Sequence, residues 1–266
     1  MRGNNNISMV KKYMLLFVMA AVLSSCTSSK KITYFQNITS LNERISSNYE
    51  ATLKADDLLL IMVSSSNPDA AVPFNLPIVG VMNSTNTSSD VVGGQMQYQS
   101  YLVNALGEIE FPVIGSVKVG GLTRTKAMEE LYAELKKYIK DPIINMRILN
   151  YKVSVMGEVV QPGVFNVLTE RITLPEALSR AGDLTIYGNR KNILIVREVD
   201  GKKTHNFVDI TSSDFINSPF YYLSQNDLVY VEPNRTKINS SAIGPNTGVI
   251  ISAVSLLITI VALVIR

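Results

Sequence analysis

The chain closes with a long uncharged segment, residues 248–265, that contains 18 consecutive positions without Lys, Arg, Asp or Glu. As an α-helix this segment would be about 27 Å long, close to the roughly 30 Å hydrocarbon core of a bilayer. Asn246 and Thr247 are suitable helix starters, and Arg266 can lie at the interface. The segment predicts a C-terminal transmembrane α-helix, residues 247–266, so the rest of the chain must fold outside the membrane.

Small or weakly polar residues recur along one face of this predicted helix at spacings of four and three. A stripe of this kind lets membrane helices pack closely against one another. Alternatively, the stripe lines a water-filled lumen inside a ring of helices. Both alternatives imply self-association, and both use the same pore-lining or helix-packing candidates: Gly248, Ser252, Ser255, Thr259 and Ala262.

The other end of the chain has the organisation of a bacterial secretory signal. Lys11 and Lys12 precede an apolar run, residues 13–23, which is short for a membrane span but suits the core of a signal peptide. The run leads through Leu-Ser-Ser to Cys26, the only cysteine, and this ending resembles a lipobox. We predict a signal peptide at residues 1–25 and lipidation of Cys26. The alternative is a free buried thiol, because a lone cysteine cannot form an intramolecular disulfide.

The predicted lipid would hold the mature chain at a membrane surface, because two or more acyl chains anchor a protein stably. Thr27, rather than an aspartate, follows the cysteine. This favours transport to the outer membrane, with the body of the protein in the periplasm. A polar tether is expected at residues 26–49, in which Tyr34-Phe35-Gln36 is the only apolar cluster.

Composition excludes several functional classes. Three of the 25 basic residues precede Cys26, so 22 remain against 22 acidic residues and the mature chain is neutral. A neutral chain does not indicate nucleic-acid binding. His205 is the only histidine and lies in a polar, strand-like stretch, where we expect a solvated surface residue. With no other histidine and no free cysteine, no transition-metal site is expected, and no cofactor.

The first half of the mature chain predicts a small α+β domain at residues 50–150. An apolar run at 58–63 indicates a buried strand, and the Pro- and Ser-rich stretch 64–99 a surface insertion. Residues 101–111 predict a hairpin with its turn near Gly107. Thr123 is expected to start a helix in which apolar residues recur at helical spacing.

The second half predicts a compact sheet packed on one helix. A strand is expected at residues 153–157 and a last strand at 228–231. Thr173 and Glu176 form a capping-box pattern at the start of a helix. Asp200-Gly201 joins two alternating segments and is a strong hairpin signal. These elements describe a β-grasp-like domain at residues 151–232. A polar linker, residues 233–246, is expected before the last helix.

Several of these motifs resemble a known family. The residues from Tyr101 through Gly121-Leu-Thr123 to Asp141-Pro142 resemble the polysaccharide biosynthesis/export domain. Val155-Met-Gly157-Glu-Val159, then Pro162-Gly163, Leu174 to Gly182 and Ile195-Val-Arg197 resemble the soluble-ligand-binding (SLBB) β-grasp domain. In order and spacing the chain is similar to the Wza-like outer-membrane polysaccharide export family.

The resemblance implies a non-enzymatic function. Family members are ring oligomers whose C-terminal helices form a barrel through the outer membrane. Capsular or exopolysaccharide passes through the middle, supplied by an inner-membrane polysaccharide co-polymerase. The implied partners are therefore other copies of the chain, a polysaccharide, the co-polymerase and outer-membrane lipid. The sequence departs from the family pattern at Lys54-Ala-Asp-Asp57, in place of Pro-Gly-Asp, and at Ala181-Gly182-Asp183, in place of Ala-Gly-Gly.

Two other functions are alternatives to the exporter. An enzyme would have to use the acidic pairs Asp56-Asp57 or Glu129-Glu130, but no nucleophile, base and orienting acid form a recognisable motif. The chain is also consistent with a membrane-tethered glycan-binding or scaffold lipoprotein without a pore. A variant of that alternative places the apolar C-terminal helix in the inner membrane.

Overall fold

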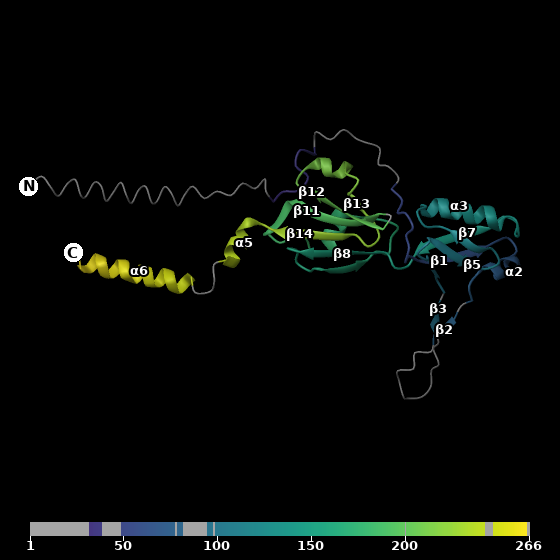
Figure 1. Ribbon diagram of the computed structural model, residues 1–266, viewed down its shortest axis with the longest axis horizontal. Helices are drawn as coiled ribbons and strands as arrows, with labels where there is room; N and C mark the ends of the chain where they lie inside the picture. Colours follow the sequence, from purple (N-terminus) through teal and green to yellow (C-terminus); the bar gives the residue numbers. More distant parts are fainter. Residues whose placement is uncertain are drawn as a thin grey trace, which may run out of the picture.

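A computed structural model describes residues 32–38, 49–77, 79–81, 95–97, 99–199, 201–242 and 247–264. Two α+β domains follow one another along the chain, as predicted, and two helices come after them (Figure 1). The predicted signal peptide and Cys26 lie outside the described residues. We call residues 49–149 the first domain and residues 151–233 the second domain.

The first domain is built around a three-stranded antiparallel sheet of order β4-β1-β7, with a helix packed on one face. Its elements are β1 (Leu58–Ser64), α2 (Pro68–Ala71), η3 (Val72–Phe74), β2 (Val79–Val81), β3 (Gln95–Gln97), β4 (Tyr101–Leu102), β5 (Glu108–Phe111), β6 (Gly115–Lys118), α3 (Arg124–Leu135) and β7 (Ile143–Ile148).

The core of this domain lies between α3 and the sheet. Ala127, Leu131 and Leu135 recur at helical spacing and are completely buried. The side chain of Thr123 accepts a hydrogen bond from the backbone N–H of Lys126, which confirms Thr123 as the residue that starts the helix. Strand β1 buries only alternate residues, because successive side chains point to opposite faces of a sheet. The apolar run 58–63 is therefore buried on one face only.

Two expectations for the first domain are corrected. The hairpin predicted over residues 101–111 does not form, because β4 pairs with β1 while β5 pairs with β6. Gly107 does turn the chain, but the backbone of Val103 exchanges hydrogen bonds with Asp56 and Asp57, which commits this segment to the edge of β1. The stretch 64–99 is also not entirely a surface insertion, since Phe74 is buried in the core.

The second domain is a five-stranded sheet of order β12-β11-β14-β8-β9. Strands β14 and β8 pair in parallel and the other neighbours are antiparallel. Its elements are β8 (Lys152–Gly157), β9 (Gly163–Asn166), β10 (Ile172–Thr173), α4 (Leu174–Arg180), β11 (Gly188–Val199), β12 (Lys202–Val208), η4 (Ser213–Asn217), β13 (Tyr222–Leu223) and β14 (Leu228–Pro233).

Local signals in the second domain are confirmed. Thr173 and Glu176 form both hydrogen bonds of a capping box at the start of α4. Strands β11 and β12 pair as the predicted hairpin, with Ile193 to Val199 opposite Val208 to Lys202, and Gly201 has a φ of +72°. Gly157 ends β8 with a φ of +94°, and a Cβ there would lie 2.1 Å from the carbonyl oxygen of Val231. Only glycine permits this close approach between the parallel strands.

The linker predicted at residues 233–246 contains a helix, α5 (Arg235–Ala242). The side chain of Asn234 accepts a hydrogen bond from the N–H of Lys237, and its own backbone N–H bonds to Tyr187. The polar linker therefore contains a capped helix that its composition did not predict. The Asn234 side chain stabilises the helix by accepting a hydrogen bond from an N–H of the first turn. The last element is α6 (Thr247–Val264). Within the described part of the chain, no helix is both long and apolar enough to cross a membrane.

Candidate functional site

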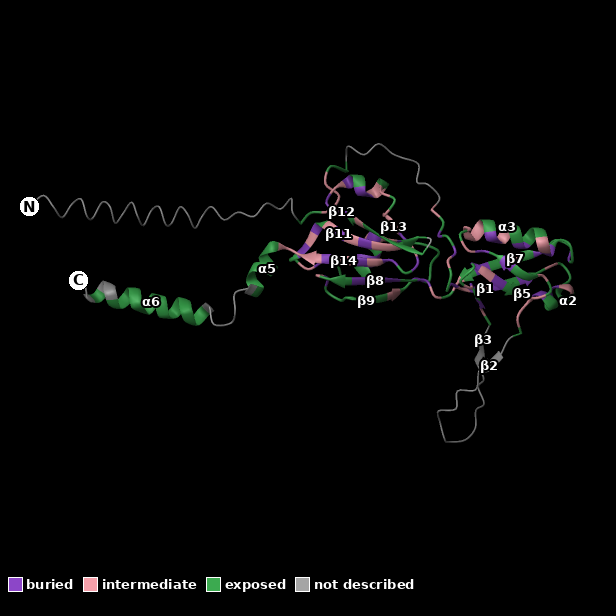
Figure 2. Cartoon of the chain, in the orientation of Figure 1, coloured by how far each residue is buried: buried purple, intermediate pink, exposed green. Residues whose placement is uncertain are grey.

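The five predicted stripe residues belong to α6, which carries the exposed side chains at the C-terminal end of the chain (Figure 2). Ser252 donates a hydrogen bond from its hydroxyl to the carbonyl of Gly248, and Thr259 does the same to Ser255. These hydroxyls are satisfied within the helix, so they do not require a water-filled lumen. The side chain of Ala262 lies outside the described residues.

The apolar cluster in the predicted tether is docked on the second domain. We call residues 33–37 the strap. The backbone N–H of Phe35 bonds to Ile210 at 3.2 Å, and that of Gln36 bonds to Thr211 at 2.7 Å. In return, the carbonyl of Gln36 accepts a hydrogen bond from Ser213 at 3.1 Å. The strap therefore adds a short parallel bridge beside η4, and this corrects the expectation of an irregular tether here.

Side chains fasten the strap as well. The hydroxyl of Tyr34 donates a 2.7 Å hydrogen bond to the carboxylate of Asp183, and the guanidinium of Arg190 lies 5.3 Å from the centre of its ring. Arg190 is itself fixed by hydrogen bonds to the carbonyls of Thr185 and Gly188. Burial and the Asp183 carboxylate raise the pKa of Tyr34 to about 12, so the hydroxyl keeps its proton at neutral pH.

Asp183 explains one departure from the family pattern. Its φ is +69°, a left-handed conformation that glycine adopts readily and that an aspartate adopts less often. The same carboxylate oxygen that accepts from Tyr34 also accepts from the backbone N–H of Leu184 at 2.7 Å. The side chain thus provides an acceptor for the strap at the position where the family pattern has glycine.

Amide side chains join the two domains. The Asn150 carboxamide accepts from the N–H of Leu58 and donates to the carbonyl of Asp56, both in the first domain. Gln225, which is 3% exposed, donates to the carbonyl of Asn150 and accepts from the N–H of Lys152. The chain therefore crosses from one domain to the other within a short peptide whose polar groups are satisfied from both sides.

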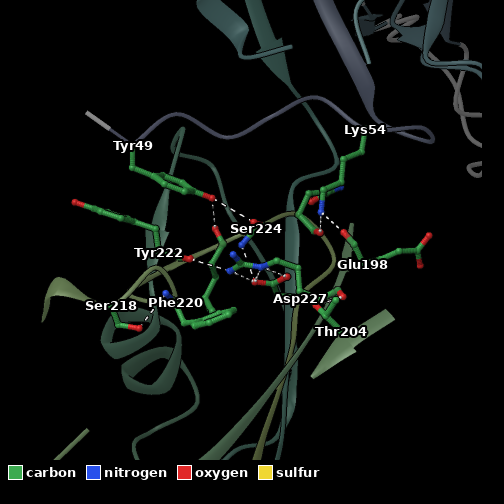
Figure 3. A network of polar contacts seen from close by, with 12 residues as sticks. Tyr49, Lys54, Glu198, Thr204, Ser218, Phe220, Tyr222, Ser224 and Asp227 are labelled. Carbon is green, nitrogen blue, oxygen red and sulfur yellow. Dashed lines mark hydrogen bonds and ion pairs between the residues drawn. The ribbon is translucent and has the colours of Figure 1, made fainter. Parts of the chain in front are cut away.

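The segment that enters the first domain also grips the second (Figure 3). The Tyr49 ring stacks on Tyr222 with centroids 4.7 Å apart, and its hydroxyl donates to the carbonyl of Leu223. The ammonium of Lys54 donates to the carbonyls of Glu198 at 3.0 Å and Gln225 at 3.4 Å. Burial lowers the pKa of Lys54. A lysine of the Lys54-Ala-Asp-Asp57 segment thus binds carbonyl oxygens of the second domain.

A buried ion pair lies beneath these contacts. Arg197 and Asp227 form three hydrogen bonds of 2.7 to 3.1 Å, and the Arg197 guanidinium lies 5.2 Å from the Phe220 ring centre. Arg197 also donates to the carbonyl of Tyr222, and Asp227 accepts from the N–H of Ser224. The pair therefore holds the loop between β13 and β14, on which Tyr49 and Lys54 rest.

Asp57 is a buried carboxylate at the start of β1. One oxygen accepts from the N–H of Lys54 at 2.8 Å, whereas the other has no hydrogen-bond partner. Burial raises the pKa of Asp57 to about 6, against a partial lowering by the Lys54 backbone N–H. Its neighbour Asp56 is exposed, so the acidic pair noted in the sequence separates into one structural and one surface carboxylate.

The other chemistry-bearing candidates lie apart. Glu129 and Glu130 are exposed on α3, and His205 is exposed on β12, as expected for a solvated surface residue. Within the described ranges, no group of three or more His, Cys, Asp or Glu residues could hold a metal ion. These contacts form a junction between the two domains, because the polar side chains of Asn150, Gln225 and Lys54 bind backbone groups across it.

Sequence reasoning missed most of the contacts at this domain junction. The ion pair joins residues 30 positions apart, and Gln225 bonds to Asn150 across 75 positions. No local spacing rule connects such residues. The strap did leave a signal, since Tyr34 and Phe35 are aromatic residues in an otherwise polar stretch. An isolated aromatic pair of this kind is a reason to expect docking rather than a free tether.

Comparison with known proteins agrees with these two domains. Residues 45–149 match the family model for polysaccharide biosynthesis/export protein, and residues 151–231 match the SLBB domain. The EPS I polysaccharide export outer membrane protein EpsA of Ralstonia nicotianae is 36% identical over 109 residues, 40% of this chain and 29% of the relative. EpsA of Ralstonia solanacearum is 29% identical over 161 residues, 58% of this chain and 42% of that relative.

The chain thus spans less than half the length of these curated relatives. The two matched domains are contiguous and in the order expected, and they cover both folded parts of the structure. This chain belongs to the Wza-like polysaccharide export family.

Proposed function

We propose that this protein is a subunit of an oligomeric ring that conducts a capsular or extracellular polysaccharide across the periplasm and outer membrane. The observation that carries the proposal is the export domain followed directly by the SLBB domain, as in a family of polysaccharide export proteins. The two relatives are named as outer-membrane proteins that export the EPS I polysaccharide. The ring makes and breaks no bond in the polymer; the energy comes from synthesis and from an inner-membrane co-polymerase.

The geometry supports one orientation of the subunit. The strap binds the second domain, and α5 leaves from the end of β14 in the same domain (Figure 1). Thr33 lies seven positions after Cys26, and an extended chain of that length reaches at most about 25 Å. If Cys26 is lipidated, the second domain lies close to the outer membrane and the first domain extends into the periplasm.

The C-terminal segment is the second membrane element of the proposal. The described apolar side chains of α6 are exposed, among them Ile250 at 61% and Leu257 at 61%. An apolar helix in this state is stable only when lipid or other helices cover it. In the ring, residues 247–266 of neighbouring copies would associate through the stripe and contact outer-membrane lipid.

The direct test is negative-stain electron microscopy of the protein extracted in mild detergent from the outer-membrane fraction. We expect rings with a central, stain-filled cavity. The matched measurement is polysaccharide export from cells that lack the gene, which should stop while polymer synthesis continues. Small featureless particles, together with unchanged export, would refute the conduit.

A membrane-tethered glycan-binding or scaffold lipoprotein without a pore is the second candidate. It is favoured by one observation, that the hydroxyls of Ser252 and Thr259 form hydrogen bonds within α6 and so need no water-filled lumen. The two candidates differ in the exposure of α6 to water. Ser252→Cys and Ser255→Cys should react with a polar, membrane-impermeant thiol reagent if the stripe faces a lumen, whereas Leu256→Cys and Leu257→Cys should not. Equal protection of all four would favour the pore-less protein.

A further inference from the structure

The strap and helix α5 meet the second domain at the same loop, which connects α4 to β11 at the end facing away from the first domain (Figure 1). The strap reaches this loop through the hydrogen bond from Tyr34 to Asp183. Helix α5 begins beside it, because the N–H of Asn234 donates to the carbonyl of Tyr187 at 2.7 Å and its side-chain amide donates to that of Ile186 at 3.4 Å. The loop and the first turn of α5 therefore form one surface.

Charge is distributed unevenly between the segments at this end and the rest of the mature chain. Five of the 22 basic residues after Cys26 lie in residues 27–42 and 233–266, which contain no acidic residue. The 17 others share residues 43–232 with all 22 acidic residues, which gives that part a net charge of −5. The neutral mature chain therefore combines two basic segments with an acidic body. The five basic residues are Lys30, Lys31, Arg235, Lys237 and Arg266.

The surface formed by the loop and α5 combines exposed apolar side chains with cations. Ile186 is 59% exposed, Ile238 53% and Tyr187 39%. The Lys237 ammonium lies 5.2 Å from the centre of the Tyr187 ring, and neither Lys237 nor Arg235 forms an ion pair with another described residue. We call these five residues the end patch. Tyrosine beside the stems of lysine and arginine is the combination enriched where proteins meet the headgroup region of a bilayer.

We propose that the end patch binds the phosphate headgroups of the membrane leaflet that anchors the chain. The inference rests on the proposed function for placing a membrane next to the second domain, and it names the side chains that contact it. Chain length is consistent with this contact. Thr247, which begins α6, lies five positions after Ala242, which ends α5, so at most about 18 Å separate the two helix ends.

A lipid surface fits the end patch because the basic helix leads directly into an apolar one. Helix α6 holds no charged residue, and its described side chains are exposed. Basic residues next to an apolar segment are attracted by the negative surface potential of a leaflet, and each contributes about 1 kcal/mol, which is about fivefold in binding. The side chains of Ile186 and Ile238 can then enter the boundary between headgroups and acyl chains.

The test uses the absence of tryptophan from the chain. Tyr187→Trp places a single fluorophore in the end patch of the full-length protein, reconstituted in vesicles of phosphatidylethanolamine and phosphatidylglycerol. Lipids brominated next to the headgroup should quench its emission at least about twofold, and lipids brominated at the end of the acyl chain should quench it less, because the contact is shallow.

The matched control is Tyr132→Trp on α3 of the first domain. Tyr132 is also 39% exposed, and the Lys136 ammonium lies 5.9 Å from the centre of its ring. The brominated lipids should leave the emission of this variant unchanged. Equal quenching of the two variants would overturn the proposal, because the membrane would then not be specific to the end patch.

Removal of the two cations tests the contribution of charge. In the Tyr187→Trp protein, Arg235→Gln together with Lys237→Gln should lower the quenching at least about twofold, because two attractions to lipid phosphate are lost. The control is Lys136→Gln together with Lys137→Gln, two exposed lysines of the first domain, which should not alter it. Unchanged quenching without Arg235 and Lys237 would overturn their role as phosphate ligands.

Electron microscopy of the same samples separates this inference from the ring. Rings in which the Tyr187→Trp reporter is unquenched would overturn the membrane contact and leave the ring as a proposal. A quenched reporter without rings would refute the ring and support the contact. A reporter with blue-shifted emission that no brominated lipid quenches would mean that a second copy of the chain covers the end patch, and this also would overturn the proposal.

Discussion

The two segments outside the domain cores, the strap and helix α6, differ in what holds them. The strap is a polar segment with two aromatic residues, and it binds the second domain through three backbone hydrogen bonds and the Tyr34–Asp183 contact. Helix α6 is strongly apolar, yet its described side chains are exposed. The difference shows that apolar composition does not decide docking within one chain. The strap docks where its backbone and side-chain hydrogen bonds find partners, whereas the described apolar side chains of α6 remain exposed.

The largest expected effect concerns the ion pair beneath the entry segment. Asp227→Ala leaves the Arg197 guanidinium, whose side chain is 13% exposed, without its partner. We expect a loss of about 3–5 kcal/mol in the free energy of unfolding, measured by urea denaturation. The control is Arg124→Ala, which removes an ion pair to Glu170, 69% exposed, and should cost at most about 1 kcal/mol. Equal losses would show that burial adds nothing to the contribution of the Arg197–Asp227 pair.

The next effect tests the junction between the two domains through the pH dependence of the free energy of unfolding. Because the folded-state pKa of Asp57 is raised from 3.8 to about 6, the folded protein binds this proton more tightly than the unfolded chain. Its contribution to stability is complete below about pH 4 and is lost as pH rises through 6. Asp57→Asn should therefore be more stable than wild type at pH 7, by roughly 2 kcal/mol, and similar to it at pH 4.

The control for Asp57→Asn is the neighbouring Asp56→Asn. Asp56 is exposed with a φ of +67°, a conformation that asparagine tolerates well. The control should leave the difference in stability between pH 4 and pH 7 unchanged. If the stability of Asp57→Asn depends on pH in the same way as that of the wild type, the buried Asp57 carboxylate is not the cause of the pH dependence.

A smaller effect is expected at the strap. Tyr34→Phe removes the hydroxyl that donates to Asp183, at a cost of about 1 kcal/mol to docking. The amide of Gln36, which bonds to Thr211, should then exchange with solvent about fivefold faster in a hydrogen-exchange experiment. Tyr132→Phe on the exposed face of α3 is the control and should change nothing. Unaltered exchange at Gln36 would mean that backbone pairing alone holds the strap.

The smallest effect concerns α6. Truncation after residue 246 should leave the free energy of unfolding of the two domains within about 0.5 kcal/mol of wild type, because the exposed helix contributes no described packing to the body. Size-exclusion chromatography of the same variant should show loss of the detergent-extracted assembly. A destabilised body would indicate that α6 packs on a domain, and the contrast with the strap would disappear.

Several parts of the fold follow from local sequence. The capping box of Thr173 and Glu176, the helix start at Thr123 and the Asp200-Gly201 hairpin all appear as predicted. Each is a signal within about four residues, where hydrogen bonds form regardless of distant partners. The predicted hairpin over residues 101–111 does not form, because β4 pairs with β1, a strand remote in the sequence, rather than with β5.

The sequence by itself determined the two-domain order, the caps and turns, and the candidates for lipidation and self-association. Only the tertiary structure decided that the tether docks at Asp183, that Gln225 and Asn150 join the domains, and that Arg197 and Asp227 are buried together. The physical reason is distance along the chain. Local propensities act between neighbouring residues, whereas these contacts form only after folding has brought remote segments into one low-dielectric environment.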